Sequence, residues 1–132
     1  MMDIRKVLMF TSIALLLSAC GATGTGGGLF QAGPAEQQLS SGVKNYEDGD
    51  YKSSMEDLQK ALETGLSNKT DQVRAHKYLA FIHCMSAREK QCRDEFKKAL
   101  EIDPAFDLKP AEAGHPLWGP VFRSVKGKPA TK

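Results

Sequence analysis

The segment Glu56-Asp-Leu-Gln-Lys-Ala-Leu-Glu63 returns 38 positions later as Asp94-Glu-Phe-Lys-Lys-Ala-Leu-Glu101. The agreement extends outward from these segments without a gap, and small, apolar and charged residues each align with their own kind. The outer pairs are Lys52 with Lys90, Gly49 with Ala87, Gly42 with Ala80, and Val43 with Phe81. A constant offset of this kind indicates an internal repeat of one supersecondary unit.

Each repeat unit predicts two helices joined by a short turn. Apolar residues recur at spacings of three and four on both sides of each turn, which is the period of an amphipathic helix. The turns are expected at Gly49-Asp50-Tyr51 and at Ser86–Glu89. The second helix of each unit is expected to end at Gly65 and at Asp103-Pro104, respectively. We therefore expect an all-α fold with two antiparallel helix hairpins over residues 35–107.

Four small residues mark where the paired helices must approach closely. They are Gly42, Ala61, Ala80 and Ala99. A bulky side chain at such a position would push the two helices apart.

The chain beyond the second repeat predicts an extended segment and one capping helix, together residues 108–126. His115-Pro116 can open a helix, because proline is tolerated in the first turn. Leu117, Trp118, Val121, Phe122 and Val125 then form an apolar face at helical spacing. This helix, expected over residues 115–126, should cover the open end of the repeat stack. Residues 127–132 are expected to be a frayed tail.

The first 19 residues have the features of an export signal. Arg5 and Lys6 precede an apolar run from Val7 to Leu17, which is too short to span a bilayer but has the length of a signal-peptide core. Leu17-Ser18-Ala19-Cys20 resembles the lipobox of bacterial lipoproteins. The resemblance implies cleavage before Cys20 and acylation of that cysteine, which anchors the chain to a membrane. The alternative is a secreted protein in which Cys20 has no special role.

Residues 20–34 are predicted to be the lipidated cysteine and a glycine-rich tether. A coil of about 14 such residues has a root-mean-square reach of roughly 20 Å. Gly21 is not aspartate, so the sequence has no signal for retention in the inner membrane. The expected location is the periplasmic side of the outer membrane.

The helix pairs resemble the tetratricopeptide repeat (TPR). The second unit has the spacing His76-x-x-Leu79-Ala80-x-x-His83, followed by Cys92-x-x-x-Phe96, Ala99 and Pro104. The first unit has Gly42, Gly49-Asp50-Tyr51, Leu58 and Ala61. His76 and His83 stand where the family often has aromatic residues, and residues 64–70 form a longer loop than usual.

Cys84 and Cys92 are predicted to form a disulfide. They lie at the end of one helix and the start of the next, which face each other across an antiparallel turn, and an exported protein meets an oxidising compartment. The closed loop of about nine residues would stabilise the fold by roughly 2–3 kcal/mol. The alternatives are two buried free thiols and a metal or redox site.

The sequence predicts neither an enzyme nor a cofactor site. It has no phosphate-binding glycine loop, no serine nucleophile motif, and no metal-ligand spacing that combines His76, His83 or His115 with the cysteines. The formal net charge of +2 excludes a basic footprint for nucleic acid. No small-molecule substrate is expected.

Protein binding is the function left by these exclusions. The first helix of each hairpin would line a concave groove for an extended peptide or a partner helix. The groove residues expected from the repeat register are Lys44, Tyr46, Lys77, Tyr78 and Phe81. The alternative is that Tyr46 and Phe81 belong to the core, as Trp118 could belong to the cap.

The whole pattern resembles the small repeat lipoproteins associated with type VI secretion clusters, the TssQ-like family. It combines the lipobox, two repeats, the Cys84/Cys92 pair and the ending Ile102–Phe122. The resemblance implies an adaptor that holds an envelope component of a secretion machine. The alternatives are a pilotin-like lipoprotein that escorts a secretin or pilus subunit, and a factor for envelope or peptidoglycan maintenance.

Overall fold

The computed structural model describes residues 32–127, and helices are the only regular secondary structure in this part of the chain. Its helices are α1 (Pro34–Glu47), α2 (Tyr51–Thr64), α3 (Lys69–Met85), α4 (Glu89–Ile102), α5 (Pro110–Ala113) and α6 (Gly119–Lys126). The all-α prediction is therefore confirmed. The predicted signal peptide, Cys20, most of the tether and the last five residues lie outside the described residues. Between residues 32 and 127, no helix has the length and hydrophobicity needed to cross a bilayer.

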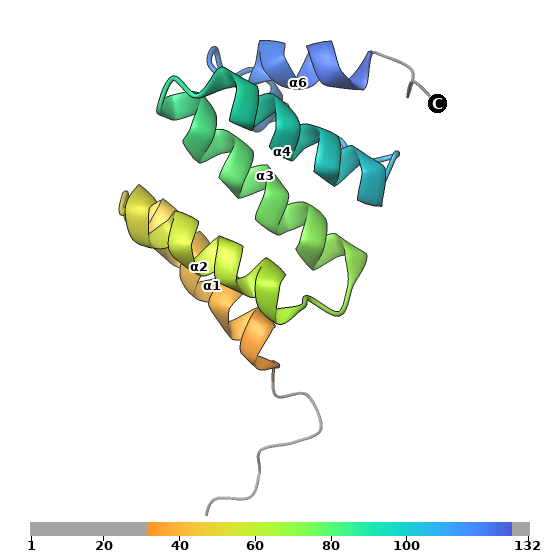
Figure 1. Ribbon diagram of the computed structural model, residues 1–132. Helices are drawn as coiled ribbons and strands as arrows, with labels where there is room; N and C mark the ends of the chain where they lie inside the picture. The colour runs from red at the N-terminus through yellow and green to blue at the C-terminus, as the bar shows by residue number, and fades with distance from the viewer. Residues whose placement is uncertain (1–31, 128–132) are drawn as a thin grey trace, which may run out of the picture. The chain divides into compact units, whose positions relative to one another are not determined.

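Helices α1 and α2 pack along their whole length on either side of the turn at Gly49 (Figure 1). The two helices approach each other closely at Gly42, where an added Cβ atom would lie 2.8 Å from Cγ of Leu58. Ser54 lies at the same contact and donates a hydrogen bond of 2.7 Å from its hydroxyl to the Gly42 carbonyl. Only glycine leaves room for this contact, so the small residue at position 42 determines how closely the pair packs.

Short turns with left-handed residues allow the chain to reverse between helices. Gly49 has φ +82°, and Asp50 caps α2 by accepting a hydrogen bond from the Ser53 amide. In the second pair the equivalent position is Ala87, with φ 57°. The Cβ atom of alanine makes this conformation sterically unfavourable, whereas glycine adopts it freely.

Helices α3 and α4 form the second pair, and the sulfur atoms of Cys84 and Cys92 lie 2.01 Å apart between them. Both cysteines are buried, as are Phe96 and Ala99 on α4. The cysteine pair links the end of α3 to the first turn of α4, across the turn that contains Ala87.

The buried side chains form two hydrophobic clusters. The N-terminal cluster is built mainly by α1, α2 and one side of α3, and the C-terminal cluster by the other side of α3, α4 and the residues after Phe106. Tyr46, Tyr78 and Met85 pack against both clusters. These three side chains therefore join the two helix pairs into one unit.

The C-terminal cap begins later than the sequence indicated. Helix α6 starts at Gly119 rather than at residue 115, and the short helix α5 interrupts the segment expected to be extended. Pro120 accounts for the late start, because its ring suits only the first turn of a helix. Val121, Phe122 and Val125 are buried and α6 packs on α4, whereas Leu117 is 50% exposed and is not part of the apolar face.

Candidate partner-binding surface

Four of the five predicted groove residues lie together, and one lies apart. Tyr46 from α1 contacts Tyr78 and Phe81 from α3, with ring centroids 4.9 and 6.3 Å away. The Lys77 ammonium lies 4.8 Å from the centre of the Tyr78 ring. Lys44 is exposed and pairs with Asp48, the residue that follows α1. The structure therefore does not bring Lys44 to the aromatic group.

Three tyrosines from three helices follow one another on this side of the molecule. The Tyr46 ring lies 5.6 Å from Tyr51, at the start of α2, and 4.9 Å from Tyr78 on α3. Tyr51 is 42% exposed and the other two are half-buried. We call Tyr46, Tyr51 and Tyr78 the tyrosine row. The repeat register did not identify Tyr51, which it assigned to the turn.

The Tyr46 hydroxyl has two other hydroxyls and the carboxylate of Glu112 in its surroundings. Burial raises the pKa of Tyr46 to about 12, and the neighbouring hydroxyls of Tyr51 and Tyr78 and the carboxylate of Glu112 raise it in the same direction. The phenol therefore stays protonated at physiological pH and can donate a hydrogen bond.

Lys77 and Glu112 form an ion pair beside the tyrosine row. Nζ of Lys77 lies 2.6 Å from Oε1 of Glu112, and their side chains are only 11% and 20% exposed. Oε2 of the same carboxylate accepts a hydrogen bond from the Lys109 amide. Removing either partner would leave a largely buried charge unpaired, which is strongly unfavourable. The sequence did not identify Glu112, because the two residues are 35 positions apart.

Phe81 belongs to the core and not to an open groove. It is 2% exposed, and its ring stacks on Trp118 with centroids 4.2 Å apart. Trp118 in turn stacks on His115 and donates a hydrogen bond of 2.8 Å from Nε1 to the Glu112 carbonyl. The segment before α6 thus covers Phe81, so the expectation that Phe81 lines a groove is wrong and its core alternative holds.

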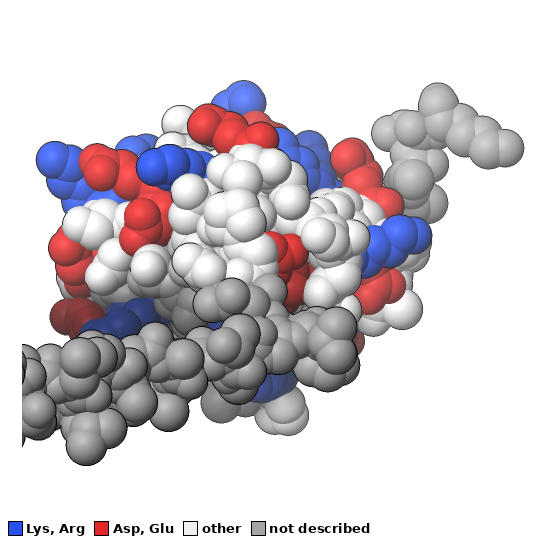
Figure 2. Space-filling view, turned by 90° about the horizontal axis from the view of Figure 1, so that it is seen from below, with Lys and Arg blue, Asp and Glu red and all other residues white. Residues whose placement is uncertain are grey.

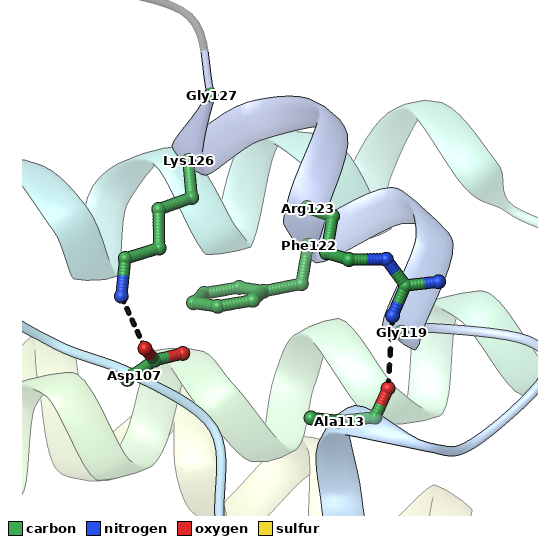
Figure 3. A pocket seen from close by; sticks show the side chains of 7 residues that line it. All are labelled: Asp107, Ala113, Gly119, Phe122, Arg123, Lys126 and Gly127. Carbon is green, nitrogen blue, oxygen red and sulfur yellow. Dashed lines mark hydrogen bonds and ion pairs between the residues drawn. The ribbon is translucent and has the colours of Figure 1, made fainter.

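A separate hollow of about 390 Å³ lies beside α6 (Figure 3). Its lining residues are Asp107, Ala113, Gly119, Phe122, Arg123, Lys126 and Gly127. The Phe122 ring lies between two cations: Lys126, which is 2.6 Å from Asp107, and Arg123, which donates to the Ala113 carbonyl over 3.0 Å. No pattern in the sequence indicated this hollow.

The histidines take different roles from those expected of aromatic replacements. Nδ1 of His76 lies 2.6 Å from Oε2 of Glu95, and Lys98 pairs with the other oxygen at 2.7 Å. Burial would raise the pKa of Glu95, but the hydrogen bonds from His76 and Lys98 outweigh it and hold the pKa below its usual value. His76 is therefore half of a polar contact between α3 and α4. Within residues 32–127 no group of histidines, cysteines and carboxylates is arranged to hold a metal ion.

His83 is buried with its Nδ1 atom unpaired. Burial and the Arg88 cation lower its pKa, Glu95 opposes them, and Lys98 lowers it further. The folded state thus favours neutral His83, so the contribution of His83 to stability is complete above about pH 6.5 and is lost as the pH falls below that value.

We expect wild type to lose stability between pH 7 and pH 5 and His83→Gln to lose less. Urea unfolding followed by circular dichroism at each pH measures the difference, and equal losses would contradict it.

The charge pattern on one face is mixed. In Figure 2, acidic and basic side chains are intermingled around uncharged surface. A surface of this kind does not attract a partner by one dominant charge sign on that face.

Comparison with known proteins identifies no relative of this chain. No protein-family model matches the chain, and no curated protein or solved structure matches it either.

Proposed function

We propose that this chain is a TPR-like lipoprotein, anchored through Cys20 to the periplasmic side of the outer membrane, that binds a protein of an envelope-spanning secretion system. The lipobox-like sequence supports the anchor, and the whole-chain resemblance supports the type VI system. The repeat at an offset of 38 residues and the two packed helix pairs support the TPR-like class.

The observation that carries the binding role is the tyrosine row beside the Lys77–Glu112 pair. Tyrosines offer a large apolar surface and a hydroxyl, which makes them frequent anchors at protein interfaces. In the part of the chain that the structure describes, none of the three hydroxyls makes a hydrogen bond to another residue, so they are available to a partner. Tyr51 in addition exposes 42% of its surface.

The geometry favours a partner that lies across α1, α2 and α3. The row is formed by the end of α1, the start of α2 and the middle of α3, so an occupant touches both helix pairs at once. An extended peptide or a single helix has the width for such a contact. The core position of Phe81 limits the surface to the three tyrosines and the exposed edge of the ion pair.

Photocrosslinking in living cells tests both parts of this proposal. A photoreactive phenylalanine replaces Tyr51, and a second chain carries it at Lys60, an exposed α2 residue that serves as the control. We expect Tyr51 to crosslink one protein and Lys60 not to. The Cys20→Ala chain is expected to lose palmitate labelling and most of that crosslink, because the domain leaves the membrane where its partner is.

Two results would overturn the proposal in different places. A Tyr51 chain that captures no protein, or captures the same set as Lys60, removes the binding role. A wild-type chain that takes up no radiolabelled palmitate, and accumulates no precursor under globomycin, removes the anchor.

A further inference from the structure

The tyrosine row has a ridged surface, because its rings are inclined to one another. The ring planes of Tyr46 and Tyr51 are 58° apart, and those of Tyr46 and Tyr78 are 64° apart. The centroids in these two pairs are separated by 5.6 and 4.9 Å, so the three rings are in contact and form no flat platform. Such a surface suits a ligand with ridges of its own and offers little area to a flat ring that stacks.

The row offers hydrogen-bond donors to a ligand. Within residues 32–127 the only buried side-chain nitrogen or oxygen that lacks a partner is Nδ1 of His83, so the unpaired hydroxyls of Tyr46 and Tyr78 reach the surface. The Tyr46 phenol stays protonated because burial raises its pKa to about 12. Both oxygens of the nearby Glu112 carboxylate already accept hydrogen bonds, one from Lys77 and one from a backbone amide. A ligand with free acceptors and few donors therefore complements the row.

Little net charge accompanies these donors. Nζ of Lys77 lies 4.8 Å from the centre of the Tyr78 ring, but Glu112 neutralises it at 2.6 Å. The side chains of this ion pair are only 11% and 20% exposed. A charged ligand would gain little from the pair, so a neutral occupant is favoured.

We propose that the tyrosine row binds a proline-rich segment of its partner in the polyproline II conformation. This assignment rests on the binding role proposed above and selects an extended peptide over a helix as the occupant. A polyproline II segment has no internal hydrogen bonds, so its carbonyls are free to accept from the tyrosine hydroxyls, whereas the carbonyls of a helix are used within the helix. Proline brings no N–H donor to a surface that lacks free acceptors, and its neutral ring packs on inclined aromatic rings.

One turn of polyproline II matches the extent of the row. Three residues that each advance about 3.1 Å cover roughly 9 Å. The two steps between ring centroids along the row are 5.6 and 4.9 Å, so a single turn can contact all three tyrosines. The segment is already stiff before it binds and loses little conformational entropy, so a surface of three rings is sufficient.

An NMR titration of the chain beginning at residue 21 with acetylated and amidated decaproline tests the proposal. Both hydrophobic clusters lie within residues 32–127, so this chain keeps its core. We expect saturable shifts of the amide signals of Tyr46, Tyr51 and Tyr78, with an affinity that added salt does not change, because the ligand is neutral. An alanine-based helical peptide and N-acetylchitotetraose, a sugar probe, are expected to cause no comparable shifts.

Substitutions at the exposed end of the row measure its contribution. Tyr51→Phe removes one hydroxyl and is expected to weaken decaproline binding about fivefold. Tyr51→Ala also removes the ring and is expected to weaken it about 30-fold. Tyr51 is 42% exposed, so neither change threatens the fold. The control Lys60→Ala alters an exposed residue further along α2 and should bind decaproline like wild type.

Four outcomes would contradict this inference. They are no saturable shift with decaproline, wild-type affinity in Tyr51→Ala, equal affinity for the helical peptide, which would identify a helical partner, and equal affinity for the sugar probe, which would identify a glycan. The Tyr51 crosslink separates these outcomes from failure of the proposed function. A crosslink without decaproline binding means that the row binds a protein of other chemistry, whereas absence of the crosslink removes the binding role itself.

Discussion

Trp118→Ala is expected to destabilise the protein by about 3–5 kcal/mol, the usual range for truncating a large buried aromatic residue. The side chain is 7% exposed, stacks on Phe81 at 4.2 Å and on His115 at 3.3 Å, and donates a hydrogen bond to the Glu112 carbonyl. Its loss uncovers Phe81 and leaves the C-terminal cluster open where the segment before α6 closes it. Urea unfolding followed by circular dichroism measures the change, since Trp118 is the single tryptophan and fluorescence would vanish with it.

Two neighbouring substitutions calibrate this effect. Trp118→Phe keeps a ring on Phe81 but loses the hydrogen bond, so we expect a loss of about 1–2 kcal/mol. Leu117→Ala removes a side chain that is 50% exposed and should change stability by less than about 0.5 kcal/mol. If Trp118→Ala lowered the free energy of unfolding no more than Leu117→Ala does, Trp118 would not fix the cap to the C-terminal cluster as the structure shows.

Cys84→Ala/Cys92→Ala is expected to lower the free energy of unfolding by about 2–3 kcal/mol. The bond closes a loop between residues eight apart in sequence, and its loss lets the unfolded chain sample more conformations. Both cysteines are buried in the C-terminal cluster, and alanine leaves no unpaired polar group there. Urea unfolding with and without dithiothreitol measures the loss in the chain beginning at residue 21.

Reduction provides the matched control. Dithiothreitol should destabilise wild type as much as the double substitution does, and should leave the double variant unchanged. Alkylation of the denatured, unreduced protein should label no thiol in the chain beginning at residue 21, and reduction should expose two. Two labelled thiols before reduction would show that the bond is absent from the purified protein.

The features that the sequence predicted are those governed by neighbours along the chain. The repeat at an offset of 38 located the two helix pairs, because amphipathic spacing and turn residues act within a few positions. Gly42 was identified as a close contact for the same reason, since small residues at helical spacing leave room for a second helix. The Cys84/Cys92 pairing followed from their places on either side of one short turn.

The candidate site was predicted in part. The repeat register selected Tyr46, Lys77 and Tyr78, which lie together, but it also selected Phe81, which Trp118 covers, and Lys44, which pairs with Asp48. It gave no signal for Tyr51. Helical spacing shows which residues lie on the same face of a helix. It does not show which distant segment packs on that face.

By itself the sequence determined the helical class, the two turns and the cysteine pairing, since each depends on short-range spacing and backbone preference. Only the tertiary structure decided that Glu112 neutralises Lys77 and that His76 meets Glu95. These contacts join residues 19 and 35 positions apart. The first partner is selected when α4 packs on α3, and the second when the segment after α4 folds back on the pair. Burial of apolar surface drives that folding, and it carries no local sequence signal of which polar groups will meet.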